Sequence, residues 1–148
     1  MEKISSIFVL TIILSGCSSV PPASSDFERK AQSYTPPPNL ASLYVYRSNS
    51  FLGASVLYNI SLDHNDFGTL GTGTYLFANI VPGKHSIRAN TSGVSQVKIT
   101  KFNAMAGKLY FFKIEPAWNS LNIEIIEDSK GREQIGKYTL SGDNAFEQ

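Results

Sequence analysis

The chain contains a single cysteine, Cys17, close to its N-terminus. A thiolate is a strong nucleophile, and a lone cysteine cannot form an internal disulfide, so this thiol needs another explanation. It follows an apolar run over residues 4–14 and the small residues Ser15 and Gly16. The run is too short to cross a hydrocarbon core of roughly 30 Å as a helix. A short apolar run that follows a basic residue and ends in small residues is typical of a signal peptide.

The segment Leu14-Ser15-Gly16-Cys17 resembles the lipobox of bacterial lipoproteins. In that family the thiol is diacylated, the chain is cut before the cysteine, and the new amine is acylated. The resemblance implies cleavage between Gly16 and Cys17, a signal peptide over residues 1–16, and a membrane anchor at Cys17. Each buried CH2 of an acyl chain contributes about 0.8 kcal/mol, so several chains hold a protein on a bilayer. The alternatives are an uncleaved signal anchor and a buried N-terminal helix.

The residue after the cysteine bears on the destination of the protein. Ser18 stands where an aspartate retains lipoproteins of enteric bacteria at the inner membrane. The resemblance therefore favours the outer membrane, with the protein facing the periplasm.

Titratable side chains form a second candidate cluster. Asp63, His64 and Asp66 share one turn and could jointly bind a cation. Their order lacks the alternating ligands and the glycine of a calcium loop, so we predict a solvated turn and no metal site. His85 shares a strand face with Ile87, and we expect a half-buried structural histidine that is hydrogen-bonded near the preceding turn.

The chain carries neither the G-x-S-x-G motif of nucleophilic serine catalysis nor the Walker A loop of phosphate binding. We predict a non-enzymatic protein without a cofactor that binds or scaffolds an envelope protein or a glycan. The alternative is an envelope hydrolase or a small-molecule binder with a pocket near His64, His85 and the loop over residues 47–54.

Length and charge narrow the class of protein. With 148 residues the chain has material for one domain. Its 13 basic and 12 acidic residues leave a net charge of +1, which supplies no long-range field. This argues against a nucleic-acid partner that depends on a basic face.

Composition divides the chain after the cysteine. Residues 17–39 are rich in serine and proline and predict an extended tether, with one or two helical turns over residues 26–32. The folded domain is expected over residues 40–141, and a frayed tail over residues 142–148.

Between residues 40 and 141, short apolar segments alternate with turns rich in glycine, proline, asparagine and aspartate. This pattern predicts an all-β fold, an antiparallel β-sandwich of about seven to eight short strands. A short C-terminal helix is predicted over residues 128–135, capped by Asp128 or Ser129. The predicted strands cover residues 43–46, 55–62, 67–70, 74–80, 85–90, 94–100, 108–115 and 120–127, with a closing strand over 137–140.

Aromatic residues exceed what a sheet buried on one face needs, because residues 43–46 and 109–114 are apolar on both faces. The excess indicates a second layer, a dimer contact or an exposed groove. One interpretation is a two-sided core covered by the loop over residues 47–54 and the C-terminal segment. The other is a binding surface at Tyr44, Tyr46, Phe51 and Trp118.

The run over residues 67–87, with Pro82-Gly83-Lys84-His85 near its end, resembles bacterial lipoproteins catalogued as domain of unknown function 2846. More loosely it is similar to PEGA-type β-sandwich domains. Leu43-Tyr44-Val45-Tyr46-Arg47, followed by serine and Phe51, resembles the opening strand of the same family. The likeness covers residues 40–140 and implies a fold and an envelope address but no catalytic residues. Asp63-His64-Asn65-Asp66 departs from the family pattern, which commonly has Asp-Gly there.

Overall fold

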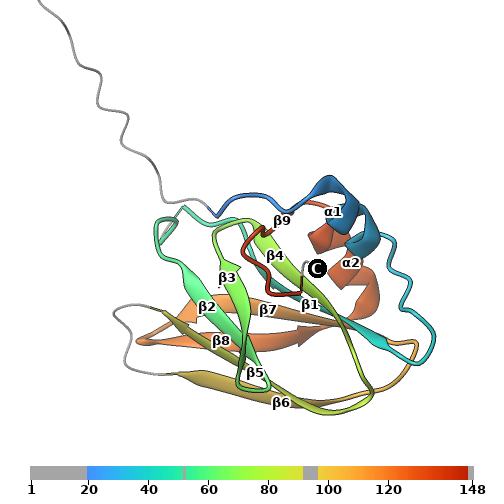
Figure 1. The fold of residues 1–148 in the computed structure, drawn as a ribbon. Helices are drawn as coiled ribbons and strands as arrows, with labels where there is room; N and C mark the ends of the chain where they lie inside the picture. The colour runs from blue at the N-terminus through green and yellow to red at the C-terminus, as the bar shows by residue number, and fades with distance from the viewer. Residues whose placement is uncertain (1–19, 52, 92–96, 147–148) are drawn as a thin grey trace, which may run out of the picture.

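The computed structural model describes residues 20–51, 53–91 and 97–146. Within these residues nine strands form two facing sheets, and two short helices cover the outer face of one sheet (Figure 1). The elements in chain order are α1 (Ser25–Ala31), β1 (Ala41–Arg47), β2 (Tyr58–Leu62), β3 (Asn65–Leu70), β4 (Thr74–Ile80), β5 (Gly83–Thr91), β6 (Lys98–Ala104), β7 (Leu109–Ala117), β8 (Ser120–Ile126), α2 (Asp128–Ile135) and β9 (Thr139–Leu140).

The predicted all-β sandwich is confirmed. One sheet has the strand order β8-β7-β1-β4-β9 and the other has the order β3-β2-β5-β6. Most neighbouring strands are antiparallel, but β1 pairs with β7, and β4 with β9, in parallel. Because β1 and β7 are parallel neighbours, the segments that follow these two strands emerge at the same end of the sheet.

A mainly aliphatic core, which also contains Tyr58, Phe67 and Phe112, fills the space between the two sheets. From β1 it contains Leu43 and Val45, and from the facing sheet Ile60 and Ile87, all fully buried. Successive side chains of a strand point to opposite faces, so the residues between Leu43 and Val45 in β1 must be covered from the other side.

An aromatic core covers that other face of the five-stranded sheet. The strand registers place Tyr44 of β1 between Phe77 of β4 and Phe111 of β7. The ring centroids lie 5.1 Å and 4.7 Å from that of Tyr44. Phe27 of α1 packs on Phe77 with a centroid separation of 5.6 Å. The aromatic excess thus belongs to a second layer, made by α1, α2 and the C-terminal segment rather than by the loop over residues 47–54.

The helix predicted over residues 128–135 is confirmed as α2, although its cap differs. Glu127 accepts a hydrogen bond from the Ser129 N–H at 3.1 Å, so neither Asp128 nor Ser129 is the capping residue. Gly131 lies directly over the ring of Phe111, where an added Cβ would approach Cγ to 2.3 Å. Close packing on the sheet therefore explains a glycine inside this helix.

The helical turns predicted over residues 26–32 are confirmed as α1, but the extended tether predicted around them is wrong for the part that the structure describes. Ser24 caps α1, and Ala31 at its end is fully buried. The Tyr44 hydroxyl donates a hydrogen bond to the Ala31 carbonyl at 2.6 Å, and the Ala23 N–H donates to the Leu140 carbonyl at 2.9 Å. The segment folds because the sheet offers its few apolar residues an aromatic face to cover, which composition alone does not reveal.

The frayed tail predicted over residues 142–148 is wrong up to Phe146. The Ala145 N–H donates to the Phe67 carbonyl at 3.0 Å, and the buried Asn144 donates its side-chain amide to the Phe77 carbonyl at 3.0 Å. Phe77 lies in one sheet and Phe67 in the other, so the C-terminal segment ties the two sheets together at one edge.

Two strands have other bounds than the sequence predicts. The strand predicted over residues 55–62 starts at Tyr58, because the carbonyl of Val56 accepts a hydrogen bond from a buried side chain, Arg47, rather than from a strand. The strand predicted over residues 94–100 overlaps β6, Lys98–Ala104, which pairs with the first part of β5, while residues 94–96 lie outside the described residues.

Candidate functional site

The predicted anchor residues Gly16 and Cys17 lie outside the described residues, as does the predicted signal peptide. The described chain begins at Val20, three positions after Cys17. A Cβ added to Gly71 would lie 3.4 Å from Val20 Cγ2 and 3.8 Å from Leu57 Cδ2, so these residues are neighbours. In the described part of the chain, neither helix is long and apolar enough to cross a membrane.

The prediction that Tyr44 and Tyr46 belong to a binding surface with two other aromatic residues is wrong. They are 0% and 1% exposed beneath the second layer. Burial raises the pKa of the Tyr44 hydroxyl well above its usual range, with the nearby hydroxyls of Tyr34 and Tyr75 adding to the effect. Burial likewise raises the pKa of Tyr46 to about 12. Both are neutral core residues.

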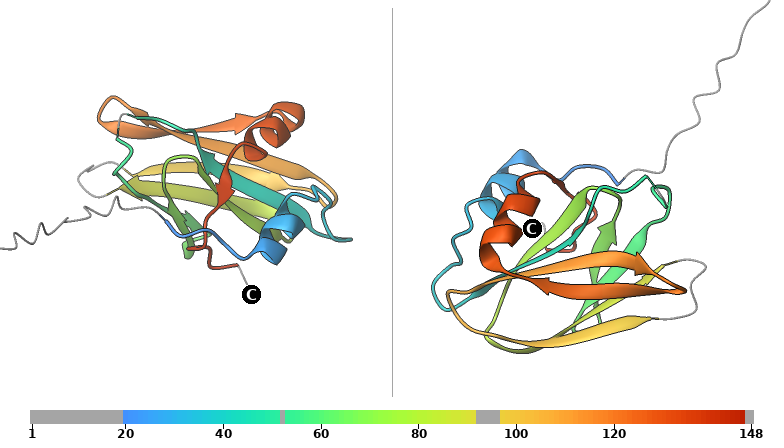
Figure 2. Two further views of the ribbon diagram at one scale, coloured as in Figure 1. Left: turned by 90° about the horizontal axis from the view of Figure 1, so that it is seen from above. Right: turned by 180° about the vertical axis from the view of Figure 1, so that it is seen from behind.

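Phe51 and Trp118, the other two, are 95% and 93% exposed. Phe51 lies in the loop after β1 and Trp118 in the turn after β7, and the parallel pairing of these strands places both at one end of the sandwich. Both views of Figure 2 show this end, where the described chain also begins. We call it the loop end and define it by loop 48–57, the turns over residues 71–73 and 118–119, and Val20.

Arg47 holds loop 48–57 from inside. Its side chain is 2% exposed; Nη2 donates to the Gly53 carbonyl at 2.7 Å and Nη1 to the Val56 carbonyl. Its Cζ lies 4.0 Å from the centroid of the Tyr58 ring, a cation–π contact. Burial lowers the pKa of the guanidinium from its ordinary value, yet arginine stays charged in proteins. Arg47 is therefore a positioning residue for the backbone under Phe51.

Thr72, in the turn between β3 and β4, ties the same loop from outside. Its hydroxyl oxygen accepts a hydrogen bond from the Ser50 N–H at 2.9 Å. Next to it, Gly73 has a φ of +66° and lies against the side chain of Asn49. Phe51 is thus presented on a loop that is fixed on both sides, while its ring is left in solvent.

At the opposite end of the sandwich, His85 and Asp63 connect two turns. His85 Nε2 lies 2.8 Å from the Val81 carbonyl, and Nδ1 lies 2.5 Å from Asp63 Oδ2. Each ring nitrogen faces an acceptor within the protein. Asp63 Oδ1 accepts from the Ser86 N–H at 2.8 Å. The prediction of a half-buried structural histidine near this turn is confirmed.

The hydrogen bonds around Asp63 also set its acidity. Partial burial acts to raise the pKa of this carboxyl group, but the hydrogen bonds from His85 and Ser86 outweigh it and hold the pKa below its ordinary value. Asp63 is therefore an ionised acceptor at neutral pH.

Comparison with known proteins identifies the family to which this chain belongs. The model of the family described as "Protein of unknown function (DUF2846)" matches residues 37–124, more than half of the chain. The chain belongs to the DUF2846 family. An uncharacterized protein of Haemophilus influenzae is 24% identical over 141 residues, which cover 92% of this chain and 82% of that protein.

The DUF2846 match extends from before β1 into β8 and so contains both Arg47 and His85 with the turns that they hold. It ends before α2 and begins after α1. The second layer over the aromatic face is therefore built by segments that flank the matched range.

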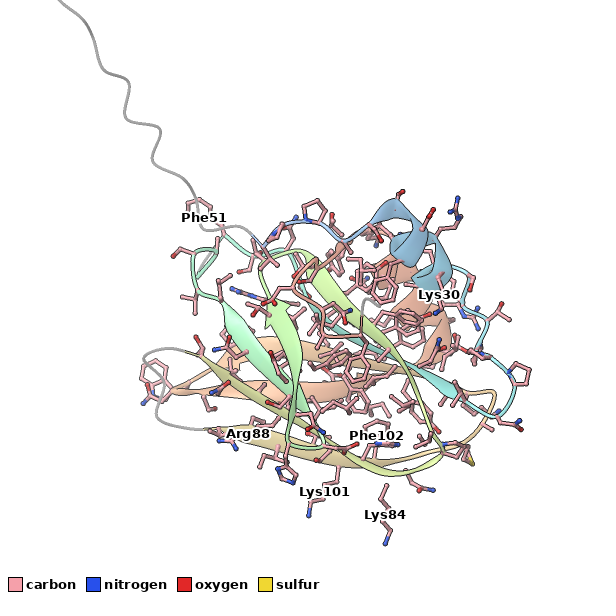
Figure 3. All side chains as sticks on the ribbon, viewed as in Figure 1. Lys30, Phe51, Lys84, Arg88, Lys101 and Phe102 are labelled. Carbon is pink, nitrogen blue, oxygen red and sulfur yellow. The ribbon has the colours of Figure 1, made fainter. Side chains whose placement is uncertain are left out.

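A shallow cavity of about 590 Å³ lies beside the His85–Asp63 pair, and Lys84, Lys101 and Phe102 line it (Figure 3). His64 is exposed in its turn and does not line this cavity, so this cavity is not the predicted pocket near both His64 and His85. Asp66 is also exposed. Among the residues placed by the structure, no group of three or more metal-ligating side chains comes together.

Arg47 and Thr72 were not predicted from the sequence as residues that position a candidate surface. A signal for Arg47 was present: alternation from Leu43 and Val45 places residue 47 on the same inward face, where an arginine needs buried acceptors. Nothing in the sequence marks Thr72, because its partner loop lies more than twenty positions away.

Proposed function

We propose that this DUF2846 protein is a lipid-anchored, non-enzymatic module of the bacterial cell envelope. In this proposal Cys17 carries the lipid, and the sandwich is displayed on the periplasmic side of the outer membrane, where it binds or scaffolds an envelope protein or a glycan. The observation that carries the proposal is the lipobox-like segment Leu14-Ser15-Gly16-Cys17 behind a short apolar run, in a chain with one cysteine.

The way the N-terminal segment joins the fold supports an anchor at this position. The first described contacts of the chain start at Val20, and Pro22 forms a β-bridge with Ser141. Cys17 precedes these contacts, so its modification disturbs none of them. An acyl group there would attach to a membrane a body whose described contacts begin three positions later.

The surroundings of His85 favour a structural role over acid–base catalysis. Both ring nitrogens are directed at acceptors within the protein, Val81 and Asp63, so neither is aimed at a ligand in the adjacent cavity. A hydrolase would need a base with a free lone pair within reach of the substrate. The alternative function at this site would therefore be binding of a small anion by Lys84 and Lys101, which line the cavity.

Metabolic labelling with an alkynyl fatty acid in a Gram-negative host tests the anchor. We expect the wild-type protein to incorporate label and to fractionate with membranes, and Cys17→Ala to incorporate none. Ser19→Ala is the matched control, because it changes a neighbouring residue without removing the thiol, and it should behave as wild type. Label in Cys17→Ala, or none in the wild type, contradicts the proposal.

Crosslinking in intact cells tests the binding or scaffolding part. We expect a specific envelope protein or glycan to be captured by the wild-type protein but not by Cys17→Ala, which cannot reach the same surface. Capture of no specific neighbour by the membrane-attached protein contradicts a scaffolding role.

A further inference from the structure

We propose that the loop end is the membrane-facing surface of this protein, with the rings of Phe51 and Trp118 seated at the lipid–water interface. This inference rests on the proposed function, because the acyl chains at Cys17 bring the loop end to the bilayer. The occupant of the exposed aromatic surface is thus a lipid surface.

The length of chain between anchor and fold limits how far the loop end can lie from the lipid. Consecutive Cα atoms are about 3.8 Å apart, so the three steps from Cys17 to Val20 span at most about 11 Å. Val20 lies beside Gly71 and Leu57, both within the loop end. Polar headgroup regions are themselves several ångströms thick. A lipid at Cys17 therefore holds this end of the sandwich against the headgroups.

The two most exposed large apolar side chains among the described residues lie at this end. Phe51 is 95% exposed and Trp118 is 93% exposed, whereas the other exposed apolar side chains range from 37% to 62%. Figure 3 shows Phe51 far from Lys84. Tryptophan and other aromatic residues are enriched where proteins meet the membrane interface, because an apolar ring is buried while polar atoms stay hydrated.

The loops at the loop end carry fewer charged side chains than the opposite end, as contact with a membrane requires. Loop 48–57 and the turns over residues 71–73 and 118–119 contain no charged residue. Arg47, which lies beneath the loop, is buried, and Glu115 near the end of β7 pairs with Lys113. Moving exposed charges toward hydrocarbon is costly, and these loops present serine, asparagine, threonine and glycine. The exposed Asp143, which lines a hollow with Val20 and Leu57, is the charge that stays at the level of the headgroups.

Because loop 48–57 is held in place by hydrogen bonds, a small contact of Phe51 with lipid can orient the protein. Arg47 and Thr72 fix its backbone from two sides, so little loop entropy is lost when Phe51 meets the lipid. Two aromatic rings give weak membrane affinity by themselves. An anchor three residues from the fold raises their effective concentration at the surface, so a weak contact suffices to orient the protein.

The proposed orientation directs the opposite end toward the periplasm. That end carries the turn of Asp63 and His64 and the cavity lined by Lys84 and Lys101. A soluble partner would therefore meet the charged end and the sheet faces, not Phe51 and Trp118.

Trp118 is the sole tryptophan of the chain, so its fluorescence reports on this surface directly. The experiment uses the acylated protein, purified from its host and reconstituted in vesicles of phosphatidylethanolamine and phosphatidylglycerol with or without brominated acyl chains. We expect the emission of Trp118 to move to shorter wavelength on reconstitution and to be quenched by the brominated lipid. The matched control is Trp118→Phe combined with Val81→Trp, because Val81 is exposed in a turn at the opposite end. Its emission should stay at the wavelength of water-exposed tryptophan and resist brominated lipid.

The outcomes separate this inference from the proposed function. An acylated protein that associates with vesicles, but whose Trp118 is quenched no more than the tryptophan at position 81, overturns the inference and leaves the anchor intact. Its exposed aromatic residues then belong to a protein or glycan contact. A protein that carries no acyl group overturns the proposed function, and the inference fails with it.

Discussion

At each end of the sandwich, a basic side chain forms hydrogen bonds with backbone carbonyls of a nearby loop or turn, but the side chain differs between the two ends. At the loop end a buried arginine, Arg47, donates to the carbonyls of Gly53 and Val56. At the opposite end a histidine, His85, bonds to the carbonyl of Val81 and to the carboxylate of Asp63. An arginine stays charged at any physiological pH, whereas the second pair depends on ionised Asp63. The difference shows that the aromatic end is fixed independently of pH, while the charged end is not.

The largest expected effect comes from breaking the arginine contact. In Arg47→Met the carbonyls of Gly53 and Val56 lose their donor and the cation–π contact to Tyr58 disappears. We expect a loss of about 2–4 kcal/mol in the free energy of unfolding, measured by denaturant titration. Limited proteolysis should show new cleavage within loop 48–57 before global unfolding.

Arg47→Lys is the control for charge. A lysine keeps the positive charge but lacks the fork that reaches two carbonyls, so its loss of stability should be smaller than that of the methionine variant. Equal stability of wild type and Arg47→Met would show that the buried guanidinium does not hold the loop.

At the other end, Asp63→Asn removes a charge-assisted acceptor from His85. Because Asp63 is partly exposed, we expect only about 1–2 kcal/mol of lost stability at neutral pH. The pKa of Asp63 is lowered in the folded state from its ordinary value of 3.8. Its ionised form therefore stabilises the fold above that value, and the contribution is lost as the pH falls through the folded-state pKa.

Unfolding measured as a function of pH checks this difference between the ends. The gap in stability between wild type and Asp63→Asn should be constant down to about pH 4 and should shrink below it. The gap for Arg47→Met should not change over the same range. A gap for Asp63→Asn that persists unchanged into strong acid would refute the role of its ionised form.

The smallest expected change in stability comes from relieving backbone strain in one hairpin turn at each end of the sandwich. His64 and Asn119 each lie in a two-residue hairpin turn, one at either end, with φ of +69° and +56°. Glycine adopts positive φ without steric cost, so His64→Gly should stabilise the fold by about 0.5–1 kcal/mol. Asn119→Gly should gain less, because asparagine tolerates this conformation better than most residues. Thermal unfolding of the two variants measures both shifts, and a larger gain at residue 119 would contradict the argument.

The strand pattern and the turn chemistry made much of the sandwich predictable. β4 was predicted with its observed bounds, and Pro82-Gly83 marked the turn before β5, because period-two alternation and turn residues act locally. The terminal segments were not predictable in this way. Residues 20–39 and 141–146 are polar in composition and fold only against surfaces that the sheets create, such as the ring of Phe77.

Only two of the four aromatic residues predicted to form the candidate surface are exposed. Phe51 and Trp118 lie in segments that read as loops, so their exposure followed from sequence. Tyr44 and Tyr46 lie in a strand that is apolar on both faces, and sequence alone could not decide whether helices, a second copy or solvent met the outer face. The decisive fact is a long-range contact, the packing of α1 and α2 on β1.

The central claim is that a lipid on Cys17 attaches this sandwich to a membrane, and mass spectrometry of the N-terminal peptide tests it most directly. Trypsin cleaves after Arg29, so the protein from its native host should yield a peptide over residues 17–29 that carries acyl groups on the thiol and on a blocked amine. A peptide that continues upstream through Gly16, with a free thiol at Cys17, would contradict the account.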